Sequence, residues 1–221
     1  MPDKLERQVA HLNQHPEHGL VYGDITAFCD GAVETVSYFA ERPPHEGRVF
    51  QKLLEQNFIT NVTVLVRKSC LEAIGGYDES LRTSEDYELW LRFCREFPVG
   101  YVPEVLVKVR RHAGNLTRDD CDTHRDHLLV LDRITARFRG SIPRPLVRQA
   151  YAQTYFKLGC GHLRSRRFPL AKEALLQSWR YNPVSWSLYR YLAASMLPEP
   201  VLNHLLNQRE DVRRPNGNGS H

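Results

Sequence analysis

A change of residue pattern near residue 120 constrains this chain more than any other feature. Before it, β-branched runs such as TNVTVLVR (60–67) alternate with short amphipathic segments, which predicts a mixed fold of strands and helices. After it, only helical periodicity continues. Proline-containing breaks divide the second region at 141–145, 182–185 and 197–200. We therefore expect an α/β domain over 1–120, an all-helical region over 121–208 and a disordered tail over 209–221.

The charge of the chain divides at nearly the same place. Residues 1–132 hold 15 Lys and Arg against 22 Asp and Glu, whereas residues 133–221 hold 15 against 4. A basic half can contact an anionic membrane surface, although a solvated basic surface is the simpler interpretation. We find no interleaving of aromatic and basic residues, so nucleic acid is not an expected partner.

The cysteines and the distribution of apolar residues indicate the cellular compartment of the protein. Five cysteines are scattered along the 221 residues and never form a CxxC pair, which argues against both a disulfide framework and a zinc site, and for a reducing compartment. The N-terminal residues are charged, and no run of eighteen apolar residues occurs. We expect a cytoplasmic protein, with peripheral membrane contact as an alternative.

Local patterns predict the elements of the first region. The segment 2–16 is expected to be a helix with an inward stripe of Leu5, Val9 and Leu12. The other expected elements are a strand over 19–25, a hairpin or loop over 26–44, a helix over 46–56 with Val49, Leu53 and Leu54 inward, a strand over 60–67, a short helix with a Ser69–Glu72 capping box and a Gly75–Gly76 stop, and one or two strands over 101–112 interrupted at Pro103.

The stretch TSEDYELWLRF (83–93) predicts a helix capped by Thr83 or Ser84, with an acidic first turn. Its expected buried face consists of Tyr87, Trp90, Leu91 and Cys94. Glu85 and Asp86 then lie on the flank, at the mouth of any cleft that the helix borders. A carboxylate here suits the helix dipole, and the same position suits a general base. The residues alone favour the structural interpretation.

Longer motifs favour the catalytic interpretation. NFITNVTVLVRKSCLEAIGGYDESL, SEDYELWLR and YVPEVLVKVRRHAGNLT follow one another in an order and spacing that resemble the acceptor-side half of family-2 glycosyltransferases of the GT-A fold. With PDKLERQVAHLNQHPEHGLVYGD, the resemblance covers about residues 2–118. It implies an inverting hexosyltransferase that uses a divalent cation, Mn or Mg. The implied substrates are a nucleotide-sugar and a hydroxyl acceptor, such as a glycan or a lipid-linked acceptor.

Four residues are candidates for the acceptor side of the site. Asp86 aligns with the catalytic base of the family, and Glu85 aligns with the acid before it. Trp90 belongs to the acceptor side, although a core position is the more plausible interpretation of this side chain. Asp24, in VYGD, matches an aspartate of the family to which we assign no definite role.

A loop motif near residue 112 aligns with a donor-side loop of the family. Arg110, His112, Asn115 and Thr117 match the pattern R-x-H-x-x-N-x-S, with threonine in the last position. In the family this loop covers the donor diphosphate, so Arg110 and His112 are candidates to neutralise leaving-group charge or to assist the metal. A capped loop histidine is the structural alternative for His112.

The sequence also departs from the family. Members begin with a nucleotide-binding half that ends in a D-x-D metal loop, and no D-x-D or DD occurs in the corresponding place here. Asp119 and Asp120 lie far downstream of it. We therefore expect the C-terminal part of a transferase, inactive as an isolated chain and without a tightly bound metal of its own. The alternative is a non-catalytic interaction module.

Residues 155–183 resemble a single tetratricopeptide repeat. The matching positions are Tyr155, Leu158, Gly159, His162, Ala171, Leu175, Ser178 and Pro183. The small residues Gly159 and Ala171 would let two antiparallel helices approach closely. A stabilising helical bundle and a partner-binding repeat are equally open. Arg164, Arg166 and Arg167 form a basic knob at the turn, suited to an acidic protein partner or an anionic membrane surface.

Overall fold

The computed structural model describes residues 1–29, 32–33, 39–40, 43–81, 83–110, 120–198 and 200–202. Backbone contacts group the chain into two compact units. The first consists of Met1–Arg118 and Leu129–Ala150, and the second of Asp119–Leu128 and Tyr151–His221. The sequence places a boundary at residue 120, whereas these contacts group residues 129–150 with the first unit. The predicted tail over 209–221 lies outside the described residues.

The first unit is a mixed α/β structure, which confirms the predicted class at this level. Its elements are α1 (Lys4–Gln14), β1 (Leu20–Cys29), β2 (Ala32–Val33), α2 (Phe50–Glu55), the 3-10 turn η1 (Asn61–Thr63), β3 (Leu65–Val66), α3 (Lys68–Ile74), α4 (Glu85–Glu96), β4 (Val99–Arg110), the second part of α5 (Asp120–Arg137) and the first part of α6 (Arg144–Arg164).

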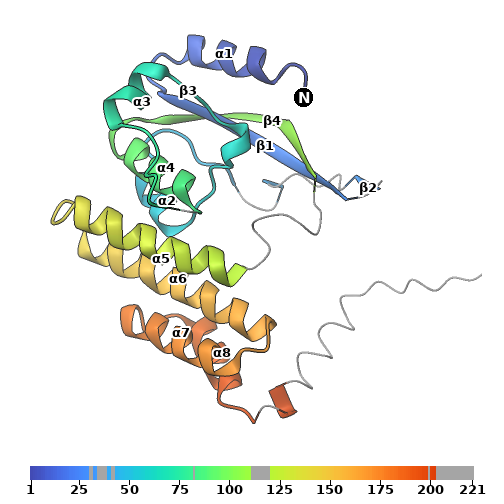
Figure 1. Ribbon diagram of the computed structural model, residues 1–221, viewed down its shortest axis with the longest axis vertical. Coiled ribbons are helices and arrows are strands. Elements are labelled where there is room, and N and C mark those ends of the chain that lie inside the picture. The colour runs from blue at the N-terminus through green and yellow to red at the C-terminus, as the bar shows by residue number, and fades with distance from the viewer. Residues whose placement is uncertain are drawn as a thin grey trace, which may run out of the picture. The chain divides into compact units, whose positions relative to one another are not determined.

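Strand β1 is the centre of a four-stranded mixed sheet. It pairs with β4 in parallel and with β2 and β3 antiparallel. Figure 1 shows α1 on one face of this sheet and α2 and α4 on the other. Under α1, Leu12 packs with Val21, Val102 and Leu106. The sheet is therefore covered on both faces, and α4 is held on the face opposite α1.

Strand β4 is continuous across Pro103. The sequence did not decide between one strand and two at this position. The register passes from Gly23 opposite Val102 to Asp24 opposite Val105, so Pro103 and its neighbour have no partner in the ladder. Proline has no N–H to donate to a ladder, and a bulge accommodates it. Asp24 therefore sits at an irregularity of the sheet.

The inward face of α1 differs from the prediction. Leu12 is buried as expected, but Leu5 is 60% exposed and Val9 is 48% exposed. Gln8 is fully buried instead, and its Nε2 donates to the Val21 carbonyl at 3.3 Å and the Thr63 carbonyl at 2.6 Å. These hydrogen bonds turn the Gln8 side of the helix inward, so the predicted stripe is wrong at Leu5 and Val9.

The strand predicted over 60–67 is also wrong for most of its length. Residues 61–63 form η1, and only Leu65 and Val66 are extended in β3. The Thr63 Oγ1 donates to the Thr60 carbonyl at 2.7 Å, and the Val64 N–H donates to the Asn61 carbonyl at 3.1 Å. These local bonds outweigh the β propensity of the run.

The short helix α3 begins before its predicted cap. Arg67 is the N-cap residue and Ser69 lies inside the helix, so the predicted capping box is wrong. The predicted glycine stop is confirmed, because Gly75 follows the last helical residue with a φ of +82°. Helix α2 begins at Phe50, later than predicted, because Gly47 forms an antiparallel bridge with Val99.

Every described element of the second unit is helical, as predicted. It contains the first part of α5, the second part of α6, α7 (Phe168–Tyr181) and α8 (Trp186–Ser195). A Cβ on Gly159 would lie 2.7 Å from the Leu175 Cγ, so α6 and α7 approach as closely as the small residue predicts. The Ser178 Oγ also donates to the Ala152 carbonyl at 2.7 Å. The tetratricopeptide assignment stays a prediction.

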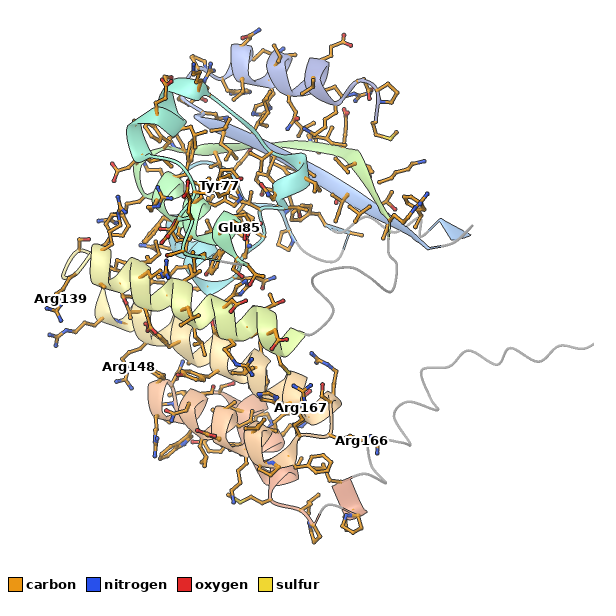
Figure 2. The ribbon with its side chains drawn as sticks, in the orientation of Figure 1. Tyr77, Glu85, Arg139, Arg148, Arg166 and Arg167 are labelled. Atoms are coloured by element: carbon orange, nitrogen blue, oxygen red, sulfur yellow. The ribbon has the colours of Figure 1, made fainter. Side chains whose placement is uncertain are left out.

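Basic and aromatic side chains are exposed on this unit. Arg166 and Arg167 project from the turn between α6 and α7 (Figure 2). Trp186 is 79% exposed and Trp179 is 44% exposed. The partner and membrane contacts predicted for this half stay predictions. Within the described part of the chain, no helix combines the length and apolarity needed to cross a membrane.

Candidate active site

The candidate site begins with two carboxylates in the first turn of α4. Ser84 precedes the helix with a φ of +60°, and its carbonyl accepts the Glu88 N–H at 3.1 Å. Glu85 and Asp86 follow, and both side chains are half-buried. Ser84, one of the two predicted cap residues, is at the N-cap position, but its side chain forms no capping hydrogen bond. Sequence and structure therefore agree on where the acidic turn lies.

Asp86 is oriented and perturbed by its surroundings. Its Oδ1 accepts the Tyr87 backbone N–H at 2.7 Å. Burial raises the pKa of the Asp86 carboxyl above its usual range; the Tyr87 N–H acts in the lowering direction, and the neighbouring Glu85 carboxylate raises the pKa again. The result is a fixed carboxylate that binds a proton more readily than an exposed aspartate does.

Tyr77 and Asn61 belong to the same site, and sequence reasoning missed both. Figure 2 places Tyr77 near the start of α4, where Glu85 is also labelled. Burial raises the pKa of the Tyr77 phenol, a hydrogen bond with the Asn61 side chain lowers it, and the Asp86 and Glu85 carboxylates raise it. Tyr77 as a whole residue is 49% exposed, so its side chain is only partly covered.

A buried ion pair fixes the turn that carries Tyr77. The Arg92 guanidinium donates to both oxygens of Glu88 at 2.8 to 2.9 Å, and both side chains are buried. Arg92 also donates to the carbonyls of Ile74 at 2.8 Å and Gly76 at 2.7 Å. Helix α4 therefore holds the end of α3 and the following turn in place.

Aromatic side chains anchor α4 in the core. The Tyr87 hydroxyl donates to the Leu53 carbonyl at 3.0 Å and lies 3.2 Å from the Leu54 carbonyl. Trp90 is 2% exposed and packs edge-on against Phe93 with ring centroids 6.4 Å apart. Trp90 is therefore a core residue, as the more plausible interpretation predicted, and it presents no face for a sugar to stack on.

Asp24 lies within the sheet, on β1. It is buried, and its Oδ1 accepts the N–H groups of Ile25 at 2.7 Å and Phe39 at 3.3 Å. Burial and the Asp24 carboxylate raise the pKa of Tyr101 to about 12. These contacts give Asp24 a structural role at the bulge of β1 and β4.

Arg110 ends β4 and is exposed. Its guanidinium carbon lies 5.3 Å from the centroid of the Phe28 ring, a cation–π distance. His112, Asn115 and Thr117, which complete the predicted donor-side motif, lie outside the described residues. The placement of Arg110 is thus described, and the rest of the motif stays a prediction.

Among the described residues, the one cluster of three or more His, Cys, Asp and Glu side chains with ligand spacing is His15, Glu17 and His18, which is rich in nitrogen and not at this turn. Mn and Mg prefer oxygen ligands, and the two carboxylates of the acidic turn, Glu85 and Asp86, offer such ligands only as a pair. The divalent cation that the resemblance implies stays a prediction.

A separate cavity of about 340 Å³ lies at the other end of α4. Its lining residues are Ala73, Ile74, Arg92, Glu96, Phe97, Arg137 and Phe138. Glu96 is the last residue of α4 and Asp86 is in its first turn, which at 1.5 Å per residue separates them by about 15 Å. The cavity is therefore distinct from the carboxylates.

About half of the chain is similar to proteins named as glycosyltransferases. A protein of Haemophilus influenzae with the name uncharacterized glycosyltransferase is 30% identical over 120 residues, which are 53% of this chain and 43% of that protein. The amylovoran biosynthesis glycosyltransferase AmsE of Erwinia amylovora is 30% identical over 111 residues, 50% of this chain and 40% of AmsE. An uncharacterized glycosyltransferase of Rickettsia typhi is 31% identical over 126 residues, which are 52% of this chain and 37% of that protein.

The similarity covers only part of each relative. The chain spans about two fifths of the length of these three proteins. No protein-family profile matches it. The shared name supports the transferase class that the sequence motifs predicted.

Proposed function

We propose that this chain is the acceptor-side part of an inverting glycosyltransferase and that Asp86 is its general base. The observation that carries the proposal is the half-buried Asp86 carboxylate, whose pKa burial raises, at the start of α4 beside Glu85 and Tyr77. A base is most effective when its pKa approaches the working pH. The relatives named glycosyltransferases support the reaction class.

In the proposed reaction, an acceptor hydroxyl oxygen attacks the anomeric carbon of a nucleotide-sugar. Its proton passes to the Asp86 carboxylate as the new carbon–oxygen bond forms. The bond from the anomeric carbon to the diphosphate breaks, and its electron pair leaves with the nucleoside diphosphate. Attack from the opposite side inverts the anomeric configuration. The Tyr87 N–H bond to Oδ1 keeps the carboxylate oriented for this transfer.

The surrounding groups suit a hydroxyl-rich acceptor. Glu85 and the exposed Tyr77 phenol offer an acceptor and a donor of hydrogen bonds beside Asp86. The Glu88–Arg92 pair keeps the Tyr77 turn at α4, so these groups keep their spacing. On the donor side, Arg110 is the proposed contact for the diphosphate, because a guanidinium neutralises phosphate charge effectively.

The proposal is tested by following nucleoside diphosphate release from UDP- and GDP-sugars in the presence of hydroxyl acceptors. Asp86→Asn is expected to lower the transfer rate by about 10²- to 10⁴-fold, the usual contribution of a general base. Asp122→Asn changes a carboxylate that is 66% exposed on α5 and serves as the matched control. Circular dichroism of both variants checks that folding is intact.

Equal transfer rates for wild type and Asp86→Asn would remove Asp86 from the base role. Absence of release with every donor is the result expected of an inactive isolated chain, and the variants are then compared by calorimetric binding of a hydroxyl acceptor. Equal affinities of wild type, Asp86→Asn and Asp122→Asn for that acceptor would favour the non-catalytic interaction module.

A further inference from the structure

Four side chains that the proposed reaction does not use gather where α1 ends and β1 begins. The rings of His11, His15 and His18 have centroids 4.6 to 5.4 Å apart. Glu17 Oε1 lies 3.2 Å from His15 Nδ1 and 3.7 Å from His18 Nε2. Three imidazoles and one carboxylate thus lie close together over a short stretch of the chain.

We propose that His15, Glu17 and His18 bind a zinc ion. One ligand atom from each of the three lies within 4.8 Å of the others. Zinc holds nitrogen and oxygen ligands at about 2.0–2.2 Å in a tetrahedron, which places neighbouring ligand atoms roughly 3.3–3.5 Å apart. The distances of 3.2 and 3.7 Å from Glu17 Oε1 bracket that spacing. Two imidazoles and one carboxylate, with water in the fourth position, are a known zinc ligand set.

His11 supports the site without binding the ion. Its Nε2 lies 3.2 Å from His18 Nδ1, the ring nitrogen opposite the proposed ligand atom. A metal on His18 Nε2 requires the proton on Nδ1, and that N–H can donate to His11 Nε2. Such a bond fixes the tautomer and the orientation of a ligating histidine.

Backbone contacts hold the ligands in place before any ion binds. The His15 N–H donates to the His11 carbonyl at 2.9 Å, and the His18 N–H donates to the His15 carbonyl at 3.1 Å. Arg67 Nε donates to the His18 carbonyl at 2.8 Å. A Cβ on Gly100 would lie 2.2 Å from His11 Nε2 and 2.6 Å from His18 Nδ1, so the backbone of β4 packs directly against these two rings. The backbone of both histidine ligands is therefore fixed before any ion binds.

The ligand atoms of this site suit a different metal from the cation expected for sugar transfer. Imidazole nitrogen suits zinc and its neighbours in the first transition series, whereas Mg and Mn prefer oxygen. The ion would tie the end of α1 to the start of β1, beside the first residues of β4. We therefore assign it a role independent of Asp86.

The test uses the full chain after removal of metal with EDTA and buffer exchange. Zinc sulfate is titrated by calorimetry and by competition with a chromogenic chelator. We expect one zinc ion per chain and an increase of the melting temperature with zinc concentration, because an ion that binds the folded state stabilises it. Cobalt substitution should give the visible spectrum of a four-coordinate ion.

Variants identify the ligands. His15→Ala, His18→Ala and Glu17→Gln are each expected to weaken zinc binding by more than about tenfold, and His11→Gln by about 10- to 100-fold through loss of the supporting contact. Glu72→Gln is the matched control, because Glu72 is an exposed, ion-paired glutamate like Glu17, with 64% against 57% of the side chain exposed. Its affinity should equal that of wild type.

X-ray absorption of zinc-loaded wild type needs no variant and should show about two imidazole ligands together with oxygen ligands. The proposal is overturned if wild type shows no saturable binding. It is equally overturned if a folded His15→Ala/His18→Ala double variant binds as wild type does, or if the absorption spectrum shows no histidine ligand. The sugar-transfer assay of Asp86→Asn is unaffected by any of these results, so the two proposals fail separately.

Discussion

Asp86 and Glu88 lie two residues apart on α4, and their surroundings are opposite. Glu88 is buried, and both of its oxygens accept hydrogen bonds from Arg92. Asp86 is half-buried and accepts the Tyr87 N–H, and no cation within the described residues pairs with it. The same functional group is thus a structural anchor at one position and an available proton acceptor two residues earlier. Neighbours decide the role, and residue type does not.

The largest effect is expected from breaking the paired carboxylate. Arg92→Met leaves Glu88 charged and buried and removes the donors to the Ile74 and Gly76 carbonyls. The free energy of unfolding should fall by about 3–5 kcal/mol, as for other buried ion pairs that lose one partner. Urea denaturation followed by circular dichroism measures this difference.

The double variant Glu88→Leu/Arg92→Met sharpens the comparison. Replacing both charges with apolar groups removes the uncompensated carboxylate, so much of the lost stability should return. Arg125→Met breaks the exposed pair with Asp122 and should cost under about 1 kcal/mol. A loss in Arg92→Met no larger than that in Arg125→Met would refute the anchoring role.

An intermediate effect is expected at the turn that Arg92 holds. Gly75 has a φ of +82° and a ψ of 167°, a region that only glycine adopts easily. Gly75→Ala should therefore lower the free energy of unfolding by about 1–3 kcal/mol. Gly76 has no positive φ, and a Cβ there would meet open space, so Gly76→Ala should change it by under about 1 kcal/mol. Equal thermal stabilities of the two variants would show that the turn is not constrained.

The smallest effect is expected at Asp86, and its sign is opposite. Folding raises the pKa of this carboxyl, so its contribution to stability is fully present below its unfolded pKa, near 4, and is lost as the pH rises through the folded pKa. Asp86→Asn should therefore be slightly more stable than wild type at pH 7, by under about 1 kcal/mol, and equal to it below pH of about 4. Urea titrations at several pH values measure this, and a variant less stable at pH 7 would contradict it.

The sequence predicted α4 well because its signals are local. The acidic turn, the cap position at Ser84 and the burial of Tyr87 and Leu91 all follow from the period of TSEDYELWLRF. Burial of Glu88 and Arg92 could not be read from that period. A pair at i and i+4 usually lies in solvent, and only the packing of α3 against this helix makes it internal.

Groups brought together by the tertiary structure escaped prediction. Tyr77 lies in a turn and Asn61 lies in a 3-10 segment. Because a strand was expected over 60–67, the sequence did not predict that Asn61 would lie beside Tyr77. The histidines of the proposed zinc site had a readable signal in their spacing at residues 11, 15 and 18, which matches one face of a helix and the turn after it. Spacing alone did not show that Glu17 turns toward them.

The bulge at Pro103 has a consequence for how this sheet behaves in a crowded solution. The outer edge of β4 carries exposed Glu104, Lys108 and Arg110, and Pro103 removes one N–H from it. The N-terminal ammonium also donates to the Leu106 carbonyl at 2.9 Å. An edge that is charged, kinked and partly occupied is a poor template for a strand of another molecule. The features that interrupt the ladder thus also protect the chain from edge-to-edge aggregation.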